Sequence, residues 1–504
     1  MRCFLGFLLI ASALADAPAE ENAQASTAAA SQPAAAPANA APAPVQFGDV
    51  IFTGTLRSRL YFWNWFQAPP GESQYVYSGN LLRLNLAEKH DAWDWDAEFA
   101  VPFLLGLPTT ATEAAPQGAL GLGSNYYAAN SASSNTAMIF PKQIYFRFDG
   151  IAGSKPQKLQ LGRFLFSDGG EIIPRNDSLA VLKRDRVSQR LLGDFGWSDV
   201  GRSFDGLHYT YSTASNDFTF IAATPTRGVY QVDGWGWNRI AFSYAAYTHE
   251  WGKGRHTADT RVFVLEYDDF RHILKTDNRP TAVRKGDTEN IVINTFGGHS
   301  LHAIATGAGP LDLVAWGAVQ TGRWGTQQQL SYAFDLEGGW QPKILPQVKP
   351  WLRGGYTDGS GDGNPSDNKH ETFFEVLPTP RPYDRFPFFN IMNMQDRFGA
   401  LVLKPHAKIT ASSEFHSLRL NNVNDLWYSG GGAYQPWTFG YTGRAVTARR
   451  SLANLYDTSI EYRAARKITL TAYLGYAQGL AIMEHIYPAG KNGQFGYLEV
   501  LYRF

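Results

Sequence analysis

The sequence predicts an all-β fold, namely a transmembrane, antiparallel, up-and-down β-barrel with short turns at one end and long loops at the other. Three observations support this. Apolar and polar residues alternate with period two along many segments, short and long connections follow one another, and aromatic residues make up 14% of the 504 residues. Beyond the N-terminal segment, no stretch is apolar over the roughly 20 residues that a spanning helix needs, so we expect the chain to cross a bilayer as strands.

Residues 1–15 have the pattern of a secretory signal peptide. Met1 and Arg2 precede the apolar run Cys3–Leu14, and Ala13 and Ala15 provide the small residues of a cleavage site. A membrane anchor is the alternative, but it needs roughly 20 apolar residues, and this run is shorter. Because Cys3 is the only cysteine, the exported protein would hold neither a disulfide nor a Cys-based metal site.

Residues 16–46 consist mostly of Ala, Pro, Ser, Gln and Glu, which bury too little apolar surface to offset the entropy of ordering. We therefore expect a disordered tether there, followed by one continuous barrel over residues 47–504. The chain carries 45 Lys and Arg against 45 Asp and Glu, and this balance argues against a nucleic-acid partner.

The C-terminal segment shows the alternation clearly. Leu498, Val500 and Tyr502 share one parity with the final Phe504, while Tyr497, Glu499, Leu501 and Arg503 have the other parity, which includes both charges. One face suits lipid and the other water. A strand that ends in Phe resembles the terminal signal that outer-membrane barrels present to their assembly machinery. A soluble sandwich would also alternate, but its polar face would point outward and its strands would usually be shorter.

The connections give an independent pattern, because outer-membrane barrels alternate short periplasmic turns with longer outer loops. Short connections are expected at residues 88–91, 150–156, 213–216, 251–256 and 307–310, and long ones at 105–137, 167–201, 271–288, 358–395 and 422–449. Strands of roughly ten residues then number about 18, with about 16 as the alternative, and an even number lets the last strand pair with the first. A barrel of this size leaves a lumen, for which passage of a solute is the default function.

Several short motifs together resemble those of the alginate-export family of outer-membrane proteins. They are Leu161-Gly162-Arg163, Arg202-Ser203-Phe204-Asp205-Gly206, Ser360-Gly361-Asp362, Asn364-Pro365-Ser366-Asp367, Leu377–Arg381, Arg385–Asn390, Phe415–Leu420 and Asp425–Ala433. Their order and spacing, more than any single motif, carry the resemblance, which extends over residues 47–504.

The resemblance implies a monomeric barrel in the bacterial outer membrane, with an arginine-rich pore through which an anionic uronate polysaccharide leaves the periplasm. It implies as partners the polysaccharide, outer-membrane lipid and lipopolysaccharide, the barrel-assembly machinery and periplasmic export components, and no nucleic acid. The chain departs from this pattern in being neutral, with acids beside the arginines on the expected inner faces. The neutral charge therefore concerns the identity of the substrate more than the existence of the pore.

A polyuronate carries a carboxylate on each sugar, and Arg suits it because the planar guanidinium can bind a carboxylate at two points. Alternation places arginines on the inner face, and acids share that face. The expected inner residues are Arg57, Arg59, Arg83, Arg147, Arg163, Arg202, Arg353 and Arg463, with Asp94, Asp96, Glu98, Asp457 and Glu461. Two alternatives remain open for each arginine: contact with the substrate, or a structural ion pair with a neighbouring acid.

Two loops contain further candidates. Residues 178–192 are expected to form a short helix with Asp177 or Ser178 as its cap and a local excess of positive charge. Its cations are Lys183, Arg184, Arg186 and Arg190, and the later loop adds Arg381 and Arg385. This helix either folds into the mouth of the barrel, where it attracts or gates an anion, or contacts lipopolysaccharide phosphates or solvent.

The loop after residue 357 places oxygen-bearing side chains at alternating positions, as in a calcium-binding loop. The candidate ligands are Asp358, Asp362, Asn364 and Asp367. A turn-rich surface loop is the alternative, because the loop has neither the flanking helices nor the bidentate Glu of the helical calcium site. Apart from this loop, no cofactor is expected.

No enzyme signature stands out. The sequence has no nucleophile elbow, zinc-protease motif or phosphate-binding loop between a strand and a helix. His416 and Ser417 are adjacent, but neighbours on a strand point to opposite faces. A secretion channel for an anionic polysaccharide is therefore expected, with a general or nutrient-uptake porin as the alternative and a barrel-borne enzyme as the third class.

Overall fold

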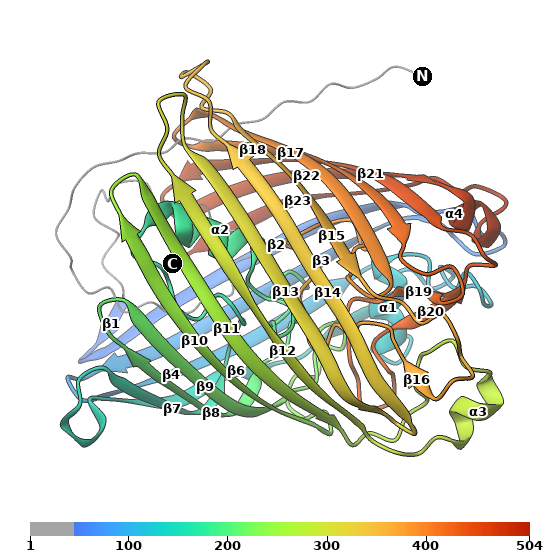
Figure 1. Cartoon of the computed structure of the whole chain (residues 1–504), viewed down its shortest axis with the longest axis horizontal. Helices are drawn as coiled ribbons and strands as arrows, with labels where there is room; N and C mark the ends of the chain where they lie inside the picture. The colour runs from blue at the N-terminus through green and yellow to red at the C-terminus, as the bar shows by residue number, and fades with distance from the viewer. Residues whose placement is uncertain (1–44) are drawn as a thin grey trace.

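The computed structural model describes residues 45–504, so the predicted signal peptide and most of the predicted tether lie outside the described residues. Eighteen strands form a closed wall in which each strand is antiparallel to the next. The last strand, β23, pairs with the first, β2, and closes the barrel (Figure 1). The prediction of about 18 antiparallel strands is confirmed.

The wall consists of β2 (Val50–Asn64), β3 (Gln74–Lys89), β4 (Trp93–Leu105), β6 (Phe140–Asp149), β7 (Gln157–Phe164), β8 (Phe204–Ser212), β9 (Asn216–Pro225), β10 (Ile240–Lys253), β11 (His256–Asp269), β12 (Ile291–Ile304), β13 (Leu311–Trp324), β14 (Gln327–Trp340), β15 (Trp351–Gly359), β17 (Met394–His406), β18 (Ile409–Leu420), β21 (Ser451–Ala465), β22 (Ile468–Gly479) and β23 (Gly493–Arg503).

Shorter elements accompany the wall. They are the strands β1 (Val45–Phe47), β5 (Asn135–Ala137), β16 (Lys369–His370), β19 (Leu426–Ser429) and β20 (Thr442–Ala445), the helices α1 (Leu122–Ala129), α2 (Asp177–Arg186), α3 (Thr281–Gly286) and α4 (Ala481–Ile486), and a 3-10 turn at Ile151–Gly153. Among the described residues, none of the helices combines the length and the apolar composition that a membrane-crossing helix requires.

The seam between β2 and β23 is sealed by the C-terminal residue. The backbone N–H of Gly54 donates to the carbonyl of Phe504 over 2.9 Å, and the N–H of Phe504 donates back to Gly54 over 3.0 Å. A Cβ at residue 54 would lie 2.4 Å from the Phe504 ring, so glycine leaves the space that the ring occupies. The final aromatic residue therefore extends the closing ladder beyond the last strand.

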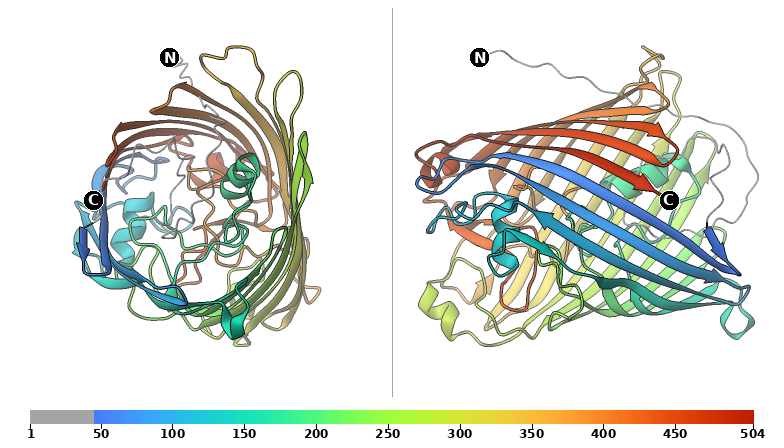
Figure 2. Two further views of the ribbon diagram at one scale, coloured as in Figure 1. Left: turned by 90° about the vertical axis from the view of Figure 1, so that its left-hand side faces the viewer. Right: turned by 180° about the vertical axis from the view of Figure 1, so that it is seen from behind.

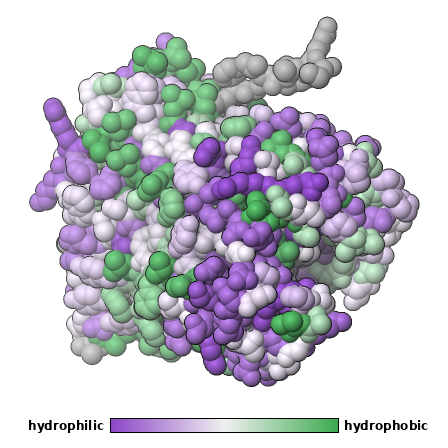
Figure 3. All heavy atoms as spheres, turned by 45° about the vertical axis from the view of Figure 1, so that its right-hand side comes forward, coloured by the Kyte–Doolittle hydropathy of each residue, from purple (hydrophilic) through white to green (hydrophobic). Residues whose placement is uncertain are grey.

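Alternation sorts the side chains between the two faces of the wall. On β2, Leu60 and Phe62 are 42% and 40% exposed, whereas Arg59 and Tyr61 are 2% and 0% exposed. Leu498, Val500 and Tyr502 on β23 are likewise exposed, as the terminal pattern predicts. Figure 3 shows hydrophobic patches along the flank of the barrel and a mainly hydrophilic surface over the end that carries the long loops.

The five predicted short connections and the five predicted long loops are found within a few residues of their expected bounds. The long loops gather at the right-hand end of the barrel in Figure 1. Two connections depart from the rule. Residues 325–326 form a tight turn at the loop end, and residues 341–350 form a longer connection at the turn end.

The predicted helix at residues 178–192 is shorter in the structure, where α2 ends at Arg186. Asn176 caps it, since its side-chain oxygen accepts the N–H groups of Ser178 and Leu179. Beyond the helix, Gln189 has a φ of 68°. The chain then pairs with another loop, with the N–H of Leu377 donating to Leu191 over 2.7 Å. Tertiary hydrogen bonds therefore end the helix before the predicted residue.

Two of the loops that pack inside the barrel carry the predicted loop cations. The first inner loop, residues 165–203, carries α2, and the second inner loop, residues 360–393, runs beside it. Viewed from the end with the short turns, α2 lies inside the ring of strands (Figure 2, left). The first inner loop also reaches that end, because the N–H of Arg175 donates to Glu250 near the end of β10 and its guanidinium donates to the carbonyl of Thr213 in a short turn.

A charge placed on the lipid-facing side of the wall should destabilise the barrel. Val262, near the middle of β11, is 59% exposed on that side. We expect Val262→Arg to lower the free energy of unfolding in a bilayer by about 2–4 kcal/mol, measured by urea unfolding in vesicles. Ala407→Arg, in the short turn between β17 and β18, is the control and should change it by less than about 1 kcal/mol. Equal losses for both would contradict the assigned faces.

Candidate solute path through the barrel

Most of the predicted charged residues lie on the inner face of the wall, since they occupy the parity opposite to the exposed apolar residues of their strands. These are Arg57, Arg59, Arg83, Arg147, Arg353 and Arg463, with Asp94, Asp96, Glu98, Asp457 and Glu461. The register agrees, because Asp94 pairs directly with Arg147 across β4 and β6. The inner face is therefore lined by charges of both signs.

Arg163 does not face the lumen as predicted. It is paired in register with Ile144, which is 44% exposed on the outer face. Its guanidinium binds both oxygens of Asp205 on β8, each over 2.7 Å. The shared parity of Leu161 and Arg163 places both on the lipid side, where an ion pair beside the strand end neutralises the arginine.

Arg202 also departs from the prediction, since it is not part of the wall. It belongs to the first inner loop, two residues before β8, and is 1% exposed. Its guanidinium donates to the carbonyls of Gly432 and Pro378, over 3.1 and 2.9 Å. Arg202 thus connects three loops to one another rather than lining the path from the wall.

Arginines of β2 anchor the first inner loop to one side of the barrel. Arg57 donates to the carbonyl of Gly196 over 2.7 Å and to that of Ser198, and Arg59 donates to the carbonyl of Trp197. Arg59 also forms an ion pair with the β23 residue Glu499. Carbonyl oxygens of the first inner loop therefore occupy guanidinium donors on the inner face of β2.

The same loop is anchored to the opposite side of the barrel by ion pairs with the wall. Lys183 binds Asp259 of β11 over 3.0 Å, and Arg190 binds Asp335 of β14 over 2.7 Å. Arg186 binds Glu337 of β14 over 2.8 Å. All of these side chains are buried. Since β2 lies opposite β11 and β14 in the ring, the loop crosses the lumen (Figure 2).

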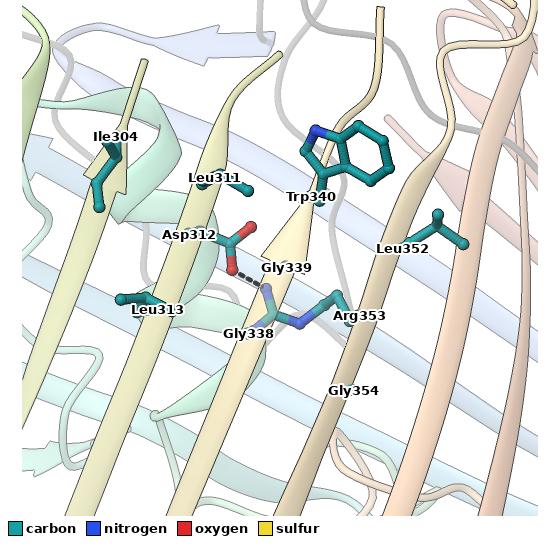
Figure 4. A pocket seen from close by; sticks show the side chains of 10 residues that line it. All are labelled: Ile304, Leu311, Asp312, Leu313, Gly338, Gly339, Trp340, Leu352, Arg353 and Gly354. Carbon is teal, nitrogen blue, oxygen red and sulfur yellow. Dashed lines mark hydrogen bonds and ion pairs between the residues drawn. The ribbon is translucent and has the colours of Figure 1, made fainter. Parts of the chain in front are cut away.

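Arg353 of β15 joins the ion pairs around Glu337 on this side of the barrel. It binds Glu337 over 2.7 Å and also pairs with Asp312 of β13. Figure 4 shows the pair of Arg353 and Asp312 between β13 and β15, beside a groove lined by Leu311, Leu313 and Leu352. Glu337 therefore accepts hydrogen bonds from guanidinium groups of both the wall and the loop.

The remaining predicted wall charges pair locally. Arg83 binds Glu98 over 2.6 Å, Arg147 binds Asp94, and Asp96 accepts the side chain of Asn85 over 2.8 Å. Arg463 lies 3.6 Å from Glu461. Asp457 is buried on the inner face of β21. These arginines therefore form ion pairs with neighbouring acids, which is the second of the two alternatives given by the sequence.

The two inner loops also join each other. Leu192 and Leu377 form a parallel bridge, and the Tyr383 hydroxyl donates to the carbonyl of Ser188 over 2.7 Å. Arg381 holds its own loop, donating to carbonyls of residues 384, 386 and 389. Arg385 lies over the ring of Tyr473 on the inner face of β22, at 5.6 Å. The remaining predicted cation, Arg184, pairs with Asp185 near the surface.

The four candidate calcium ligands do not meet in one site. Asp358 lies on β15, where its carboxylate accepts hydrogen bonds from Tyr356, Gln395 and Asn421. The side-chain oxygens of Asp362, Asn364 and Asp367 accept backbone N–H groups two residues further along the chain. Within residues 45–504, no group of three or more His, Cys, Asp or Glu side chains could hold a metal ion. These oxygens stabilise turns.

Sequence reasoning missed Asp259, Arg261 and Asp312, which lie on the inner face of β11 and β13. The period-two rule could have found them, because Val262 and Val264 are exposed on the other parity of β11. Arg261 forms an ion pair with Glu171 of the first inner loop. The rule places side chains on a face, but it does not show which loop residues they meet.

A closed 18-stranded wall with an apolar outer belt, a charged inner face and inner loops defines an outer-membrane channel protein. Residues 182–478 match the alginate export family, and this is more than half of the chain. The chain therefore belongs to the alginate export family, whose members are transport proteins rather than enzymes. None of the curated proteins matches the chain.

Solved outer-membrane channels share the fold. The crystal structure of Pseudomonas aeruginosa OccK9 (OpdG) has a TM-score of 0.53 and 11% identity, with 90% of this chain and 98% of that chain covered. OccK2 (OpdF) from the same organism, in complex with glucuronate, has a TM-score of 0.52 and 8% identity at the same coverage. Acinetobacter baumannii OccAB2 has a TM-score of 0.53 and 8% identity, again at the same coverage.

Neutralising Glu337 should release the first inner loop from the wall. In Glu337→Gln, buried guanidinium groups lose a shared carboxylate, which should cost about 3–5 kcal/mol. Unfolding experiments measure this loss, and amide exchange over residues 177–190 should become faster. Asp185→Asn, which affects a half-exposed ion pair, is the control and should cost less than about 1 kcal/mol. Unchanged exchange in Glu337→Gln would contradict the assigned anchoring.

The second inner loop should respond to pH through Asp362. Burial is the main cause that raises the pKa of its carboxyl to about 6, and nearby acids add to it. An acid with a raised pKa favours the folded loop when it is protonated, and this contribution is lost as the pH rises through about 6. We therefore expect stronger amide protection around residue 362 at pH 5 than at pH 7.5. Asp362→Asn, which resembles the protonated form, should be equally protected at both values. If amide protection in Asp362→Asn still depended on pH, a group other than Asp362 would be responsible.

Proposed function

We propose that the barrel is a secretion channel for an anionic polysaccharide of the uronate class. The observation that carries the proposal is the arginine cluster on β2 and β3, which points into the lumen of an alginate-export barrel. Arg57 and Arg59 hold backbone oxygens of the first inner loop, and these contacts use the same donors that a sugar carboxylate would use. Substrate and loop would therefore compete for the same groups.

This competition suggests how a polymer could pass without binding too tightly. A carboxylate that enters between the loop and β2 replaces a neutral carbonyl as the acceptor, and it can bind a guanidinium through two parallel hydrogen bonds between opposite charges, which a single carbonyl cannot do. The acids of β4 lie close to Arg83 and Arg147 and return those cations to their resting pairs once a sugar unit has moved on. Alternating signs along the wall would then let successive carboxylates exchange partners.

Uronate chemistry has support from a structural neighbour. The OccK2 channel has been solved in complex with glucuronate, which carries the carboxylate that we propose for the units of the polymer.

A second candidate is an uptake porin for small anions or nutrients. It is favoured by the neutral overall charge and by the many acids on the inner face, such as Asp312 and Asp335. The two candidates differ in the length of the solute. Current through single channels should be blocked by oligouronates increasingly with chain length in a secretion channel, whereas a small-solute porin would pass monomers and show no such dependence.

Replacing the inner arginines tests the path. In Arg57→Gln/Arg59→Gln/Arg83→Gln, the inner carboxylates remain while three cations are lost. We therefore expect the ratio of anion to cation permeability in planar bilayers to fall several-fold, and block by oligouronates to weaken in parallel.

The matched control removes three arginines from the outer face or its edge. Arg163→Gln/Arg239→Gln/Arg323→Gln carries the same charge change and should leave ion selectivity unchanged. If the inner and outer variants behave alike, or if the inner variant keeps the wild-type selectivity, the assigned path is incorrect.

A further inference from the structure

Three arginines lie on the outer face of the barrel at the end with the long loops. Arg397 belongs to β17, Arg419 to β18, and Arg450 immediately precedes β21. Arg397 and Arg450 are exposed, and Arg419 is half-buried. The parity of β17 supports this placement, because the neighbouring Asp396 and Phe398 are both buried on the inner face. The cluster therefore lies on the face opposite to the lumen.

The three cations surround one side chain, that of Gln395. Arg419 is the register partner of Gln395, and Arg397 is the register partner of Ser417, two residues before Arg419. Arg397 and Arg419 are thus diagonal neighbours, whose Cα atoms lie roughly 7–8 Å apart in such pairs. The guanidinium of Arg450 donates to Gln395 over 2.9 Å.

In the described part of the chain, no carboxylate forms an ion pair with this cluster, although Asp358, the register partner of Gln395, lies on the same face. Within residues 45–504, none of the three arginines makes an ion pair, in contrast to most arginines of the inner face. The nearby Asp358 is 7% exposed, and its oxygens accept hydrogen bonds from Tyr356, Gln395 and Asn421 instead. Arg397 lies over the Tyr356 ring at 5.7 Å. The surface therefore has excess positive charge and free guanidinium donors.

The cluster lies just beyond an aromatic girdle. Phe415 and Tyr456 are 37% and 46% exposed, with ring centroids 5.2 Å apart, and Tyr476 follows in the same row. The next row toward the loop end is polar, with Ser417 paired with Asn454 and Asn454 paired with Gln478. Aromatic girdles mark the membrane interface. The arginines therefore lie at the level of the headgroups of the outer leaflet.

We propose that Arg397, Arg419 and Arg450 form a binding site for the phosphates of lipopolysaccharide. Lipopolysaccharide makes up the outer leaflet of a bacterial outer membrane, and its lipid anchor carries phosphate groups next to the acyl chains. Guanidinium groups bind phosphate through two parallel hydrogen bonds, and Gln395 and Asn454 offer further polar contacts to the sugar. The aromatic row below would contact the acyl chains.

Binding of purified lipopolysaccharide to the full chain in detergent tests this site. Each cation near an anionic membrane surface contributes about a factor of five in affinity, so Arg397→Gln/Arg419→Gln/Arg450→Gln should bind about 100-fold more weakly. Lipopolysaccharide stripped of its phosphates should bind the wild-type protein about as weakly as intact lipopolysaccharide binds the variant. Resistance of the unheated barrel to denaturation on a gel checks that the variant is folded.

The control removes three cations from the short turns at the opposite end, in Arg255→Gln/Lys408→Gln/Arg466→Gln, and should keep the wild-type affinity. If the triple variant does not fold, Arg450→Gln alone, which lies outside the strands, should bind about five-fold more weakly. Wild-type affinity in the folded variant, indifference to the phosphates, or equal binding of phosphatidylglycerol vesicles would each overturn the proposal.

Discussion

The structure depends on one constraint, which is that the backbone inside a bilayer must satisfy its hydrogen bonds internally. Closure of β2 against β23 removes the open edge and leaves a wall with two faces. Because lipid accepts no charge on the outer face, charged side chains of the strands gather on the inner face or at the strand ends. The lumen is thus the consequence of closure, and its charges are the consequence of the alternation.

Charges inside the lumen need partners, and the inner loops provide many of them. Arg57 and Arg59 hold carbonyls of the first inner loop, while Asp335 and Glu337 on the opposite side hold its arginines. Removing one partner from such a buried pair costs several kcal/mol, so the loop is bound firmly in this state. Under the proposed function, a substrate would have to offer the same groups an equivalent partner.

The outer surface follows a different rule. Water and headgroups replace lipid at the strand ends, so cations there need no ion pair. Paired arginines inside and unpaired arginines beyond the girdle correspond to the two roles that we propose, namely contact with the passing solute and contact with the surrounding membrane. Arg163 is an exception, because it lies on the outer face and still pairs with Asp205.

The sequence by itself determined the class of fold, the number of strands within a small range, the positions of the loops and the face of most wall residues. Period-two alternation is a local property, and it placed Arg59 and Leu60 correctly without any tertiary information. The candidate site was predicted only in part. Some wall arginines pair with acids on a neighbouring strand, as Arg83 does with Glu98, but the loop partners lie more than 100 positions away, as for Arg57 and Gly196.

Only the tertiary structure decided where the loops go. Folding of residues 165–203 into the barrel ended α2 at Arg186, drew Arg202 away from the wall and gave Glu337 a loop partner, Arg186, beside Arg353 of the wall. The oxygens of the 358–367 segment became acceptors for backbone N–H groups and neighbouring side chains instead of metal ligands. These contacts depend on which groups face one another across the lumen. The spacing of residues within one segment does not reveal the partners that come from distant segments.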